Sequence, residues 1–213
     1  MSRTYLGPAY RIETDRLIIR CYDPKDAFLL QNAIQESLEH LRPWLPWVKD
    51  EPEELKVKIE RLRVFRADFD LSKKYFYGVF NPEETEMIGG IGLDRDIGPN
   101  AFEIGYWIHV NHVNKGYATE ISAALTKVAF EVENVNRIEI HCDPDNTRSA
   151  AIPKKLRYVF EATLRNRCEN IEGELIDSMI WSLHKDDYLK SPAAKAKIVA
   201  YDVFGNLIIS QCE

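Results

Sequence analysis

The run from Gly105 to Glu120 constrains the fold more than any other part of the chain. Its first residues alternate as in a strand, and the turn that follows leads directly into a helical pattern. Gly116 and Ala118 keep bulky side chains away, so the amides of residues 114–119 can point at an anion, which the positive end of the helix dipole also attracts. The run predicts a phosphate-binding corner. Because short glycine motifs also match by chance, an ordinary strand–loop–helix corner is the alternative.

The composition favours one compact domain. The chain has 213 residues, of which 45% are hydrophobic and 29% charged, enough to bury a substantial core. With 28 Lys and Arg against 34 Asp and Glu, the net charge of −6 argues against a broad nucleic-acid interface and favours a cationic substrate or a basic partner protein.

The same inventory indicates a compartment. No apolar run approaches the roughly 18 residues that cross a bilayer, and the start of the chain lacks the apolar core of a secretory signal. The cysteines form no CxxC pair; they are Cys21, Cys142, Cys168 and Cys212. We therefore expect reduced thiols, a cytoplasmic protein and no membrane contact.

Patterning along the chain predicts a mixed α/β fold, with an antiparallel sheet that carries helices. The expected strands cover residues 16–22, 75–81, 87–94, 101–110, 137–142, 158–168 and 176–184. The expected helices cover residues 24–38, 52–69 and 117–132, with a turn and short helix over 143–155. The strands from 75 to 110 follow one another through short turns, which predicts an antiparallel meander.

Three separated segments resemble the GNAT superfamily of acetyl-CoA-dependent N-acetyltransferases, and within it the RimJ/RimL-like branch that acetylates ribosomal-protein N-termini. They are HLRPWLPW at 40–47, FEIGYWIHVNHVNKGYATE at 102–120 and RIEIHCDPDNTRS at 137–149. Their shared order and spacing make the resemblance specific. It covers the chain from Arg16 to His184.

The resemblance implies a GNAT fold, in which the coenzyme lies in a V-shaped opening between the strands that end near Val110 and Cys142. An unpaired strand edge can hydrogen-bond an extended amide chain such as pantetheine. We expect that contact from the backbone of Trp107, Ile108 and Val110. The pyrophosphate is expected at Val113, Asn114, Lys115, Gly116, Tyr117, Ala118 and Thr119. The chain has Val113 where the family prefers Gln or Arg, and Asn114 where it often has Gly.

The resemblance also suggests residues for the chemistry, which needs a neutral amine, an oxyanion donor and a proton for the leaving thiolate. Glu169 and Glu103 each match a position that carries the base in one branch of the family, and Glu169 is the preferred candidate. Ser149 matches the acid of the RimL branch, and Asn146 its coenzyme-contacting asparagine. The alternatives are that either glutamate only faces solvent and that Asn146 only caps the helix that follows.

Two departures bear on the geometry near Ser149. Pro153 removes a backbone donor inside the short helix and is expected to kink or shorten it. Arg157 stands where the family usually has glycine. Three histidines cluster near the strand ends, but without companion ligand spacing they do not predict a metal site; they are His109, His112 and His141. Cys142 is expected to be a small buried residue.

The remaining segments concern the acceptor and the assembly. If the resemblance holds, Trp44 and Trp47 wall the acceptor entrance, and acidic residues 50–54 attract a cationic terminus. A loop whose tryptophans complete the core is the alternative. Residues 1–190 form the expected acetyltransferase domain. Residues 191–213 form an extension with a short hairpin, which is expected to dock on the sheet or on a second subunit.

We therefore expect an N-acetyltransferase that uses acetyl-CoA and no metal, and in which the amine attacks the thioester directly. The acceptor is expected to be a protein N-terminal amine, with a basic ribosomal protein as one candidate. The alternatives are a small amine, such as a polyamine or an antibiotic-like compound, and an acyl-CoA-binding module that has lost turnover. The sequence leaves open whether the protein is a monomer or a homodimer.

Overall fold

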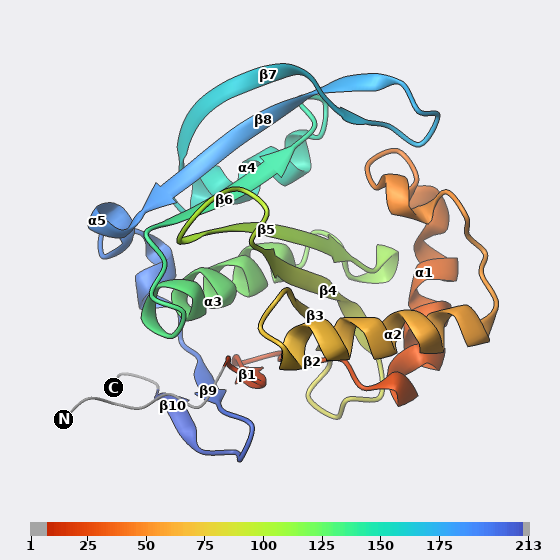
Figure 1. Cartoon of the computed structure of the whole chain (residues 1–213), viewed down its shortest axis with the longest axis horizontal. Coiled ribbons are helices and arrows are strands. Elements are labelled where there is room, and N and C mark those ends of the chain that lie inside the picture. Colours follow the sequence, from red (N-terminus) through yellow and green to blue (C-terminus); the bar gives the residue numbers. More distant parts are fainter. Residues whose placement is uncertain (1–7, 211–213) are drawn as a thin grey trace.

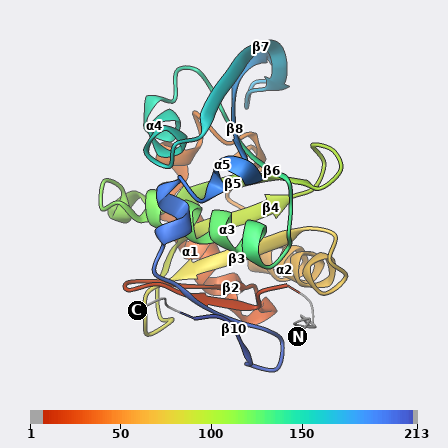
Figure 2. The ribbon, with the colours of Figure 1, turned by 90° about the vertical axis from the view of Figure 1, so that its left-hand side faces the viewer.

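The computed structural model describes residues 8–210, which form one ten-stranded sheet with helices on both faces (Figures 1 and 2). The strands are β1 Arg11–Glu13, β2 Ile18–Cys21, β3 Tyr75–Phe80, β4 Met87–Asp94, β5 Ala101–Ile108, β6 Arg137–Cys142, β7 Val159–Glu169, β8 Leu175–His184, β9 Val199–Tyr201 and β10 Leu207–Ile209. The helices are α1 Ala27–Leu41, α2 Leu55–Asp70, α3 Tyr117–Glu131, α4 Thr147–Lys155 and α5 Lys185–Tyr188. This is the mixed α/β architecture that the patterning predicts.

The strand order is β10-β9-β1-β2-β3-β4-β5-β6-β8-β7, and every neighbouring pair is antiparallel except β5 with β6. The predicted meander is present as β3, β4 and β5. The long β7–β8 hairpin forms one end of the sheet and extends past the body of the molecule (Figure 1). The one parallel pair among the described strands, β5 with β6, lies inside the sheet rather than at its edge.

Two apolar clusters hold the helices on opposite faces of the sheet. The larger one packs α3 against the sheet, with Ile121, Leu125 and Val128 fully buried. The smaller one packs α1 and α2 on the other face, through residues such as Leu30, Ile34 and Leu62. The apolar spacing of the α3 sequence therefore marks the face that it buries.

The C-terminal hairpin lies on the edge of the chain's own sheet. Strand β9 pairs with β1 through Ala200 and Ile12, and β10 pairs with β9. Gly205, at φ +75°, occupies the turn between the two strands. An isolated hairpin is marginal in water, and this pairing gives it a third strand. Residues 211–213, including Cys212, lie outside the described residues.

Candidate active site

Strands β5 and β6 separate in the middle of the sheet. They pair in parallel only from Ala101 to Glu103, opposite Arg137 to Glu139. Beyond that point β5 continues beside β4, whereas β6 continues beside β8. One edge of β5 after Glu103 therefore faces an opening, as the fold predicted from the resemblance requires.

Hydrogen-bond alternation decides which backbone groups face that opening. The carbonyl of Asn100 accepts from the amide of Asn136 on the β6 side, and the amide of His109 donates to the carbonyl of Ile88 on the β4 side. Because backbone groups alternate along a strand, even-numbered residues of β5 face β6 and odd-numbered ones face β4. The backbone groups of Tyr106 and Ile108 therefore point into the opening.

The observed backbone geometry bears on the three predicted pantetheine contacts, which stay predictions. The backbone of Trp107 faces β4, and only its indole is available to the site. Strand β5 ends at Ile108, so Val110 lies in a short 3₁₀ turn, and its amide donates to Ser37 Oγ at 3.0 Å. The contact at Ile108 is compatible with the geometry. The predicted strand end was two residues too long because the 3₁₀ turn keeps an apolar residue at 110.

The corner before α3 has the geometry of an anion site. Asn114 and Gly116 both adopt positive φ, at 62° and 83°, which turns the chain sharply into the helix. Asparagine tolerates this conformation, so Asn114 can replace the glycine that is common in the family. Across the described residues, no amide from 113 to 119 donates to a protein acceptor. Gly116 is exposed, and a Cβ placed on it would meet only the Arg16 guanidinium, at 3.7 Å, among the described residues.

Arg16 supports the corner from outside. Its guanidinium donates to the carbonyl of Lys115 at 3.0 Å and forms an ion pair with Glu120. The same guanidinium stacks 4.5 Å from the centre of the Tyr117 ring. Arg16 therefore ties the segment between β1 and β2 to the first turn of α3 and adds positive charge beside the free amides. Sequence reasoning missed this residue, since it lies almost a hundred positions from its partners.

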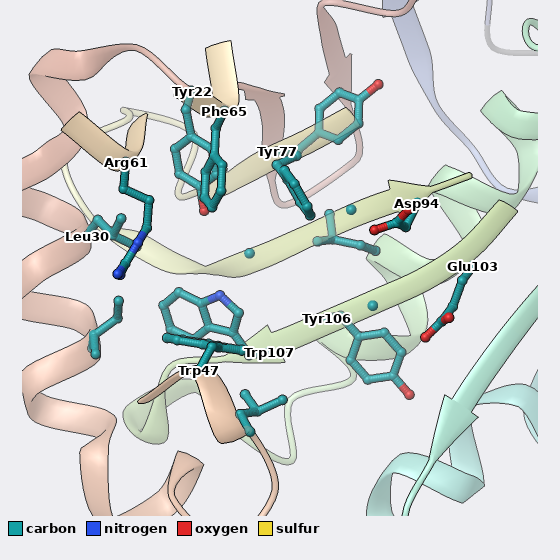
Figure 3. Close-up of a pocket in the computed structure, with 17 residues that line it drawn as sticks. Tyr22, Leu30, Trp47, Arg61, Phe65, Tyr77, Asp94, Glu103, Tyr106 and Trp107 are labelled. Carbon is teal, nitrogen blue, oxygen red and sulfur yellow. The ribbon is translucent and has the colours of Figure 1, made fainter. Parts of the chain in front are cut away.

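A cavity of about 540 Å³ lies on the α1–α2 face of the sheet, directly beside the opening (Figure 3). Its floor is β4 and β5, and its walls come from α1, α2, β3 and the loop before α2. The lining is mostly aromatic and aliphatic. The Trp47 and Trp107 rings meet edge to face, with 6.3 Å between their centres. Among residues 8–210, Glu103 and Asp94 are the carboxylates that line it.

Of the residues predicted to form the acceptor entrance, only some line this cavity. Trp47 lines the cavity, but Trp44 does not. The acidic residues before α2 do not line it either. Glu51 and Glu53 instead hold the fully buried Lys58 ammonium, and Glu53 also binds Arg61 at 2.6 Å. The charges of Glu51 and Glu53 are therefore paired with residues of α2, and they do not line the cavity.

Glu103 lies where the cavity meets the strand opening (Figure 3). Its Oε2 is 3.2 Å from His141 Nδ1, and the other ring nitrogen of His141 is 2.6 Å from Glu139 Oε2. Burial raises the pKa of Glu103; His141 opposes this shift, while Asp94 and Glu139 add to it. A carboxylate with a raised pKa beside an imidazole can accept and relay a proton. The sequence analysis considered His141 only as a metal ligand, and it missed this pairing.

Ser149 and Tyr106 meet on the opposite side of the opening. The Tyr106 hydroxyl is 3.0 Å from Ser149 Oγ and 3.2 Å from the Ser149 carbonyl. That carbonyl would accept from residue 153 in a regular helix, but Pro153 has no N–H to donate. Helix α4 nevertheless runs to Lys155, so Pro153 does not shorten the helix. The effect of Pro153 is that the Ser149 carbonyl has no helical donor and can accept from the Tyr106 hydroxyl. Tyr106 is a second residue that the sequence analysis missed.

The neighbours of Ser149 have simpler roles. Asn146 caps α4, with its Oδ1 accepting from the Ser149 amide at 3.0 Å. Cys142 is half-buried rather than buried as expected, and its partial burial raises the pKa of the thiol, which lowers its reactivity. Arg157 ends the helix at φ +61°, the conformation for which the family uses glycine, and its guanidinium donates to the Lys190 carbonyl at 3.0 Å.

Glu169 lies apart from this group. It ends β7 beside the turn of the long hairpin, is exposed, and does not line the cavity. The structure therefore brings together Glu103, Tyr106, Ser149 and Trp47 around the opening, with the free amides of the corner at its end.

The protein-family model described as acetyltransferase (GNAT) domain matches residues 16–159 of the chain. The chain belongs to this family. It is 26% identical over 187 residues to the [ribosomal protein uS5]-alanine N-acetyltransferase of Escherichia coli (strain K12), covering 85% of this chain and 94% of that enzyme. Relatives named as N-acetyltransferases, together with the domain match, make the chain an N-acetyltransferase.

Solved structures show the same fold. RimL, a ribosomal L7/L12 α-N-protein acetyltransferase in complex with coenzyme A, superposes with a TM-score of 0.73 at 19% identity, over 81% of this chain and 96% of RimL. Mycobacterium smegmatis RimJ in complex with CoA-disulfide gives a TM-score of 0.72 at 20% identity, over 88% and 90% of the two chains. The predicted GNAT fold with a splayed strand pair is therefore confirmed.

Two features are absent from the part of the chain that the structure describes. Between residues 8 and 210, no helix is both long and apolar enough to span a bilayer. In the same range, no three His, Cys, Asp or Glu side chains are grouped in a way that could hold a metal ion. A mechanism without a metal stays a prediction.

Proposed function

We propose that the protein transfers an acetyl group from acetyl-CoA to the N-terminal amine of a protein, by direct attack of the amine on the thioester. One observation carries the proposal: a corner of free main-chain amides leads along the open edge of β5 to Glu103. That arrangement suits an anionic diphosphate at one end, an extended amide chain in the middle and a base at the other. The relatives named above motivate the N-terminal acceptor.

The coenzyme would bind along the opening. Amides 113–119 would hold the pyrophosphate, with Arg16 and Lys115 adding positive charge nearby. The backbone of Ile108 and Tyr106 would pair with the pantetheine amides. The free amide nitrogen of Asn146 remains for a contact at the mouth of the opening, because only its oxygen is used in capping.

Glu103 would be the base that takes the amine proton, with His141 either passing the proton on or stabilising the carboxylate. An α-amine titrates near 7.7–8.0, so a carboxylate with a raised pKa is a sufficient acceptor. The paired hydroxyls of Tyr106 and Ser149 would donate to the departing thiolate. Glu169 remains a second candidate base that would have to act from the hairpin.

Two assays test the proposal. Coenzyme A and acetyl-CoA should each raise the melting temperature at saturating concentration, because a ligand that binds only the folded state stabilises it. Peptides with free N-termini should release thiol from acetyl-CoA, whereas the same peptides with blocked N-termini should not. If neither coenzyme shifts the melting temperature, the proposal is wrong.

We also propose a cytoplasmic location, in line with the bacterial ribosomal-protein acetyltransferases among the relatives. A small amine is the second candidate acceptor, and the cavity of about 540 Å³ beside Glu103 is the observation that favours it. An equimolar comparison of peptides and small amines, with thiol release as the readout, separates the two.

A further inference from the structure

We infer that the acceptor carries a large apolar or aromatic group directly beside its reactive amine. The inference rests on the proposed function and concerns the group that occupies the cavity next to Glu103. It names a substrate class that differs from the alanine in the name of the E. coli relative.

The size of the cavity is the first argument. At about 540 Å³ it falls within the range of roughly 300–1,000 Å³ that is typical of small-molecule sites. A methyl group displaces about as much space as one water molecule, about 30 Å³. On the carbon next to the amine, the side chain of an alanine or serine would therefore fill little of this space. An acceptor that uses this space must bring a much larger group.

Glycine residues create that space. On the cavity face, β4 and β5 place Gly92 opposite Gly105, and Gly90 opposite Trp107. A Cβ at Gly90 would lie 2.6 Å from the Trp107 indole nitrogen, and one at Gly92 would lie 2.6 Å from the Phe76 ring. The missing side chains let two aromatic rings lie flat over the floor. Above Gly105, by contrast, a Cβ would meet nothing within 4 Å, so this is the open part of the floor.

The position of Gly105 links the cavity to the chemistry. Gly105 lies between Glu103 and Trp107 on the same face of β5, because side chains two apart share a face. A group on the carbon next to an amine at Glu103 would therefore extend over Gly105 toward Trp107 and Trp47. These indoles offer flat apolar surfaces, which favour aromatic and branched aliphatic groups.

Charge in the cavity argues against a polyamine. The far wall carries the guanidinium of Arg61, which is already paired with Glu53 at 2.6 Å, so this wall offers no carboxylate to a second ammonium group (Figure 3). Asp94 is already bound to Lys74 at 2.7 Å. One amine is therefore accommodated at Glu103, and the rest of the acceptor is expected to be uncharged near the ring-lined wall.

The test uses amino-acid amides as acceptors, since their α-amines are alike and only the side chain changes. Alaninamide, serinamide, leucinamide, phenylalaninamide and tryptophanamide are compared by kcat/KM for thiol release from acetyl-CoA. Putrescine serves as the polyamine. We expect leucinamide, phenylalaninamide or tryptophanamide to exceed alaninamide by at least about tenfold. Equal or faster turnover of alaninamide, serinamide or putrescine overturns the inference and leaves the proposed transferase intact.

Gly105→Val gives a second test, because it fills the open part of the floor. The ratio of kcat/KM for phenylalaninamide to that for alaninamide should fall by at least about tenfold, while coenzyme A still raises the melting temperature. An unchanged ratio overturns the inference. If coenzyme A stabilises the wild-type protein but none of the amines tested causes thiol release, the proposed function fails, and the inference fails with it.

Discussion

The corner proposed to bind the coenzyme and the cavity proposed to bind the acceptor both adjoin β5 but are built in opposite ways. The corner is a continuous segment, residues 113–119, whose working parts are main-chain amides. The cavity is assembled from α1, α2, three strands and a loop, and its working parts are side chains. A local backbone site tolerates side-chain change, as Asn114 in place of glycine illustrates. A site made of distant side chains can change its substrate without any change of fold.

The comparison predicts that acceptor-side substitutions affect turnover and leave coenzyme binding alone. Glu103→Gln has the largest expected effect: kcat falls by about 10²–10⁴-fold, because the variant cannot accept the amine proton. The wild-type kcat should fall as the pH drops through the pKa of Glu103, which lies above its usual 4.5, since the protonated acid is no longer a base. The matched variant Glu169→Gln should retain this acidic limb.

The outcome is read from pH–rate profiles of the three proteins, with the melting shift by coenzyme A as the check on binding. Loss of the acidic limb in Glu169→Gln, with full activity in Glu103→Gln, would move the base to the hairpin and contradict the assignment.

A second prediction concerns the wall of the cavity. Lys58→Ala should lower the free energy of unfolding by about 3–5 kcal/mol, because it leaves the buried Glu51 carboxylate without its ammonium partner. Lys56→Ala, on the exposed side of the same helix, should change it by less than about 0.5 kcal/mol. Urea denaturation of both variants measures the difference. Equal stabilities would show that the ion pairs at Lys58 do not hold α2 in place.

A third prediction tests the corner alone. Gly116→Ala forces an L-residue into positive φ, at a cost of about 1–2 kcal/mol of stability, and it places a methyl group beside the anion site. Gly205→Ala, at φ +75° in the hairpin turn, matches the backbone cost without touching the site. Only Gly116→Ala should weaken coenzyme A binding, by about tenfold. Titration calorimetry reports the two affinities, and equal affinities would place the diphosphate elsewhere.

The smallest expected effect concerns the contact between the Ser149 carbonyl on α4 and the Tyr106 hydroxyl on β5. Pro153→Ala restores an N–H that can bond the Ser149 carbonyl and so compete with the Tyr106 hydroxyl. We expect kcat to fall by about threefold to tenfold, roughly 1 kcal/mol, without loss of stability. In a Tyr106→Phe background the same substitution should have no further effect on kcat. Additive losses would show that Pro153 acts through something other than the Tyr106 contact.

Features that depend on a local segment could be predicted from the sequence, whereas features that depend on contacts between distant segments could not. The meander, the α3 helix and the corner come from local patterns, and these are present where expected. Strand β1, three residues long, was not predicted, because it exists through its pairing with β2 and β9. Arg16, Tyr106 and His141 were missed as site residues for a related reason. Each gains its role from a partner on another element, and no sequence period encodes such a contact.

The departures from the family pattern also became interpretable only in three dimensions. Pro153 reads in the sequence as a break in a helix, yet α4 continues through it and the freed carbonyl meets a tyrosine from β5. Trp44 and Trp47 read as equivalent, but only Trp47 reaches the cavity. Likewise, the strand register and the hydrogen-bond alternation indicate that the backbone groups facing the opening belong to Tyr106 and Ile108 rather than to Trp107.

The central claim is that main-chain amides of the corner hold the diphosphate of the coenzyme. Titrating ¹⁵N-labelled protein with coenzyme A and following the amide resonances tests this most directly. We predict that the largest shifts fall on residues 114–119, where the amides have no protein acceptor. Saturable binding that leaves these amides unshifted while others move would contradict the claim.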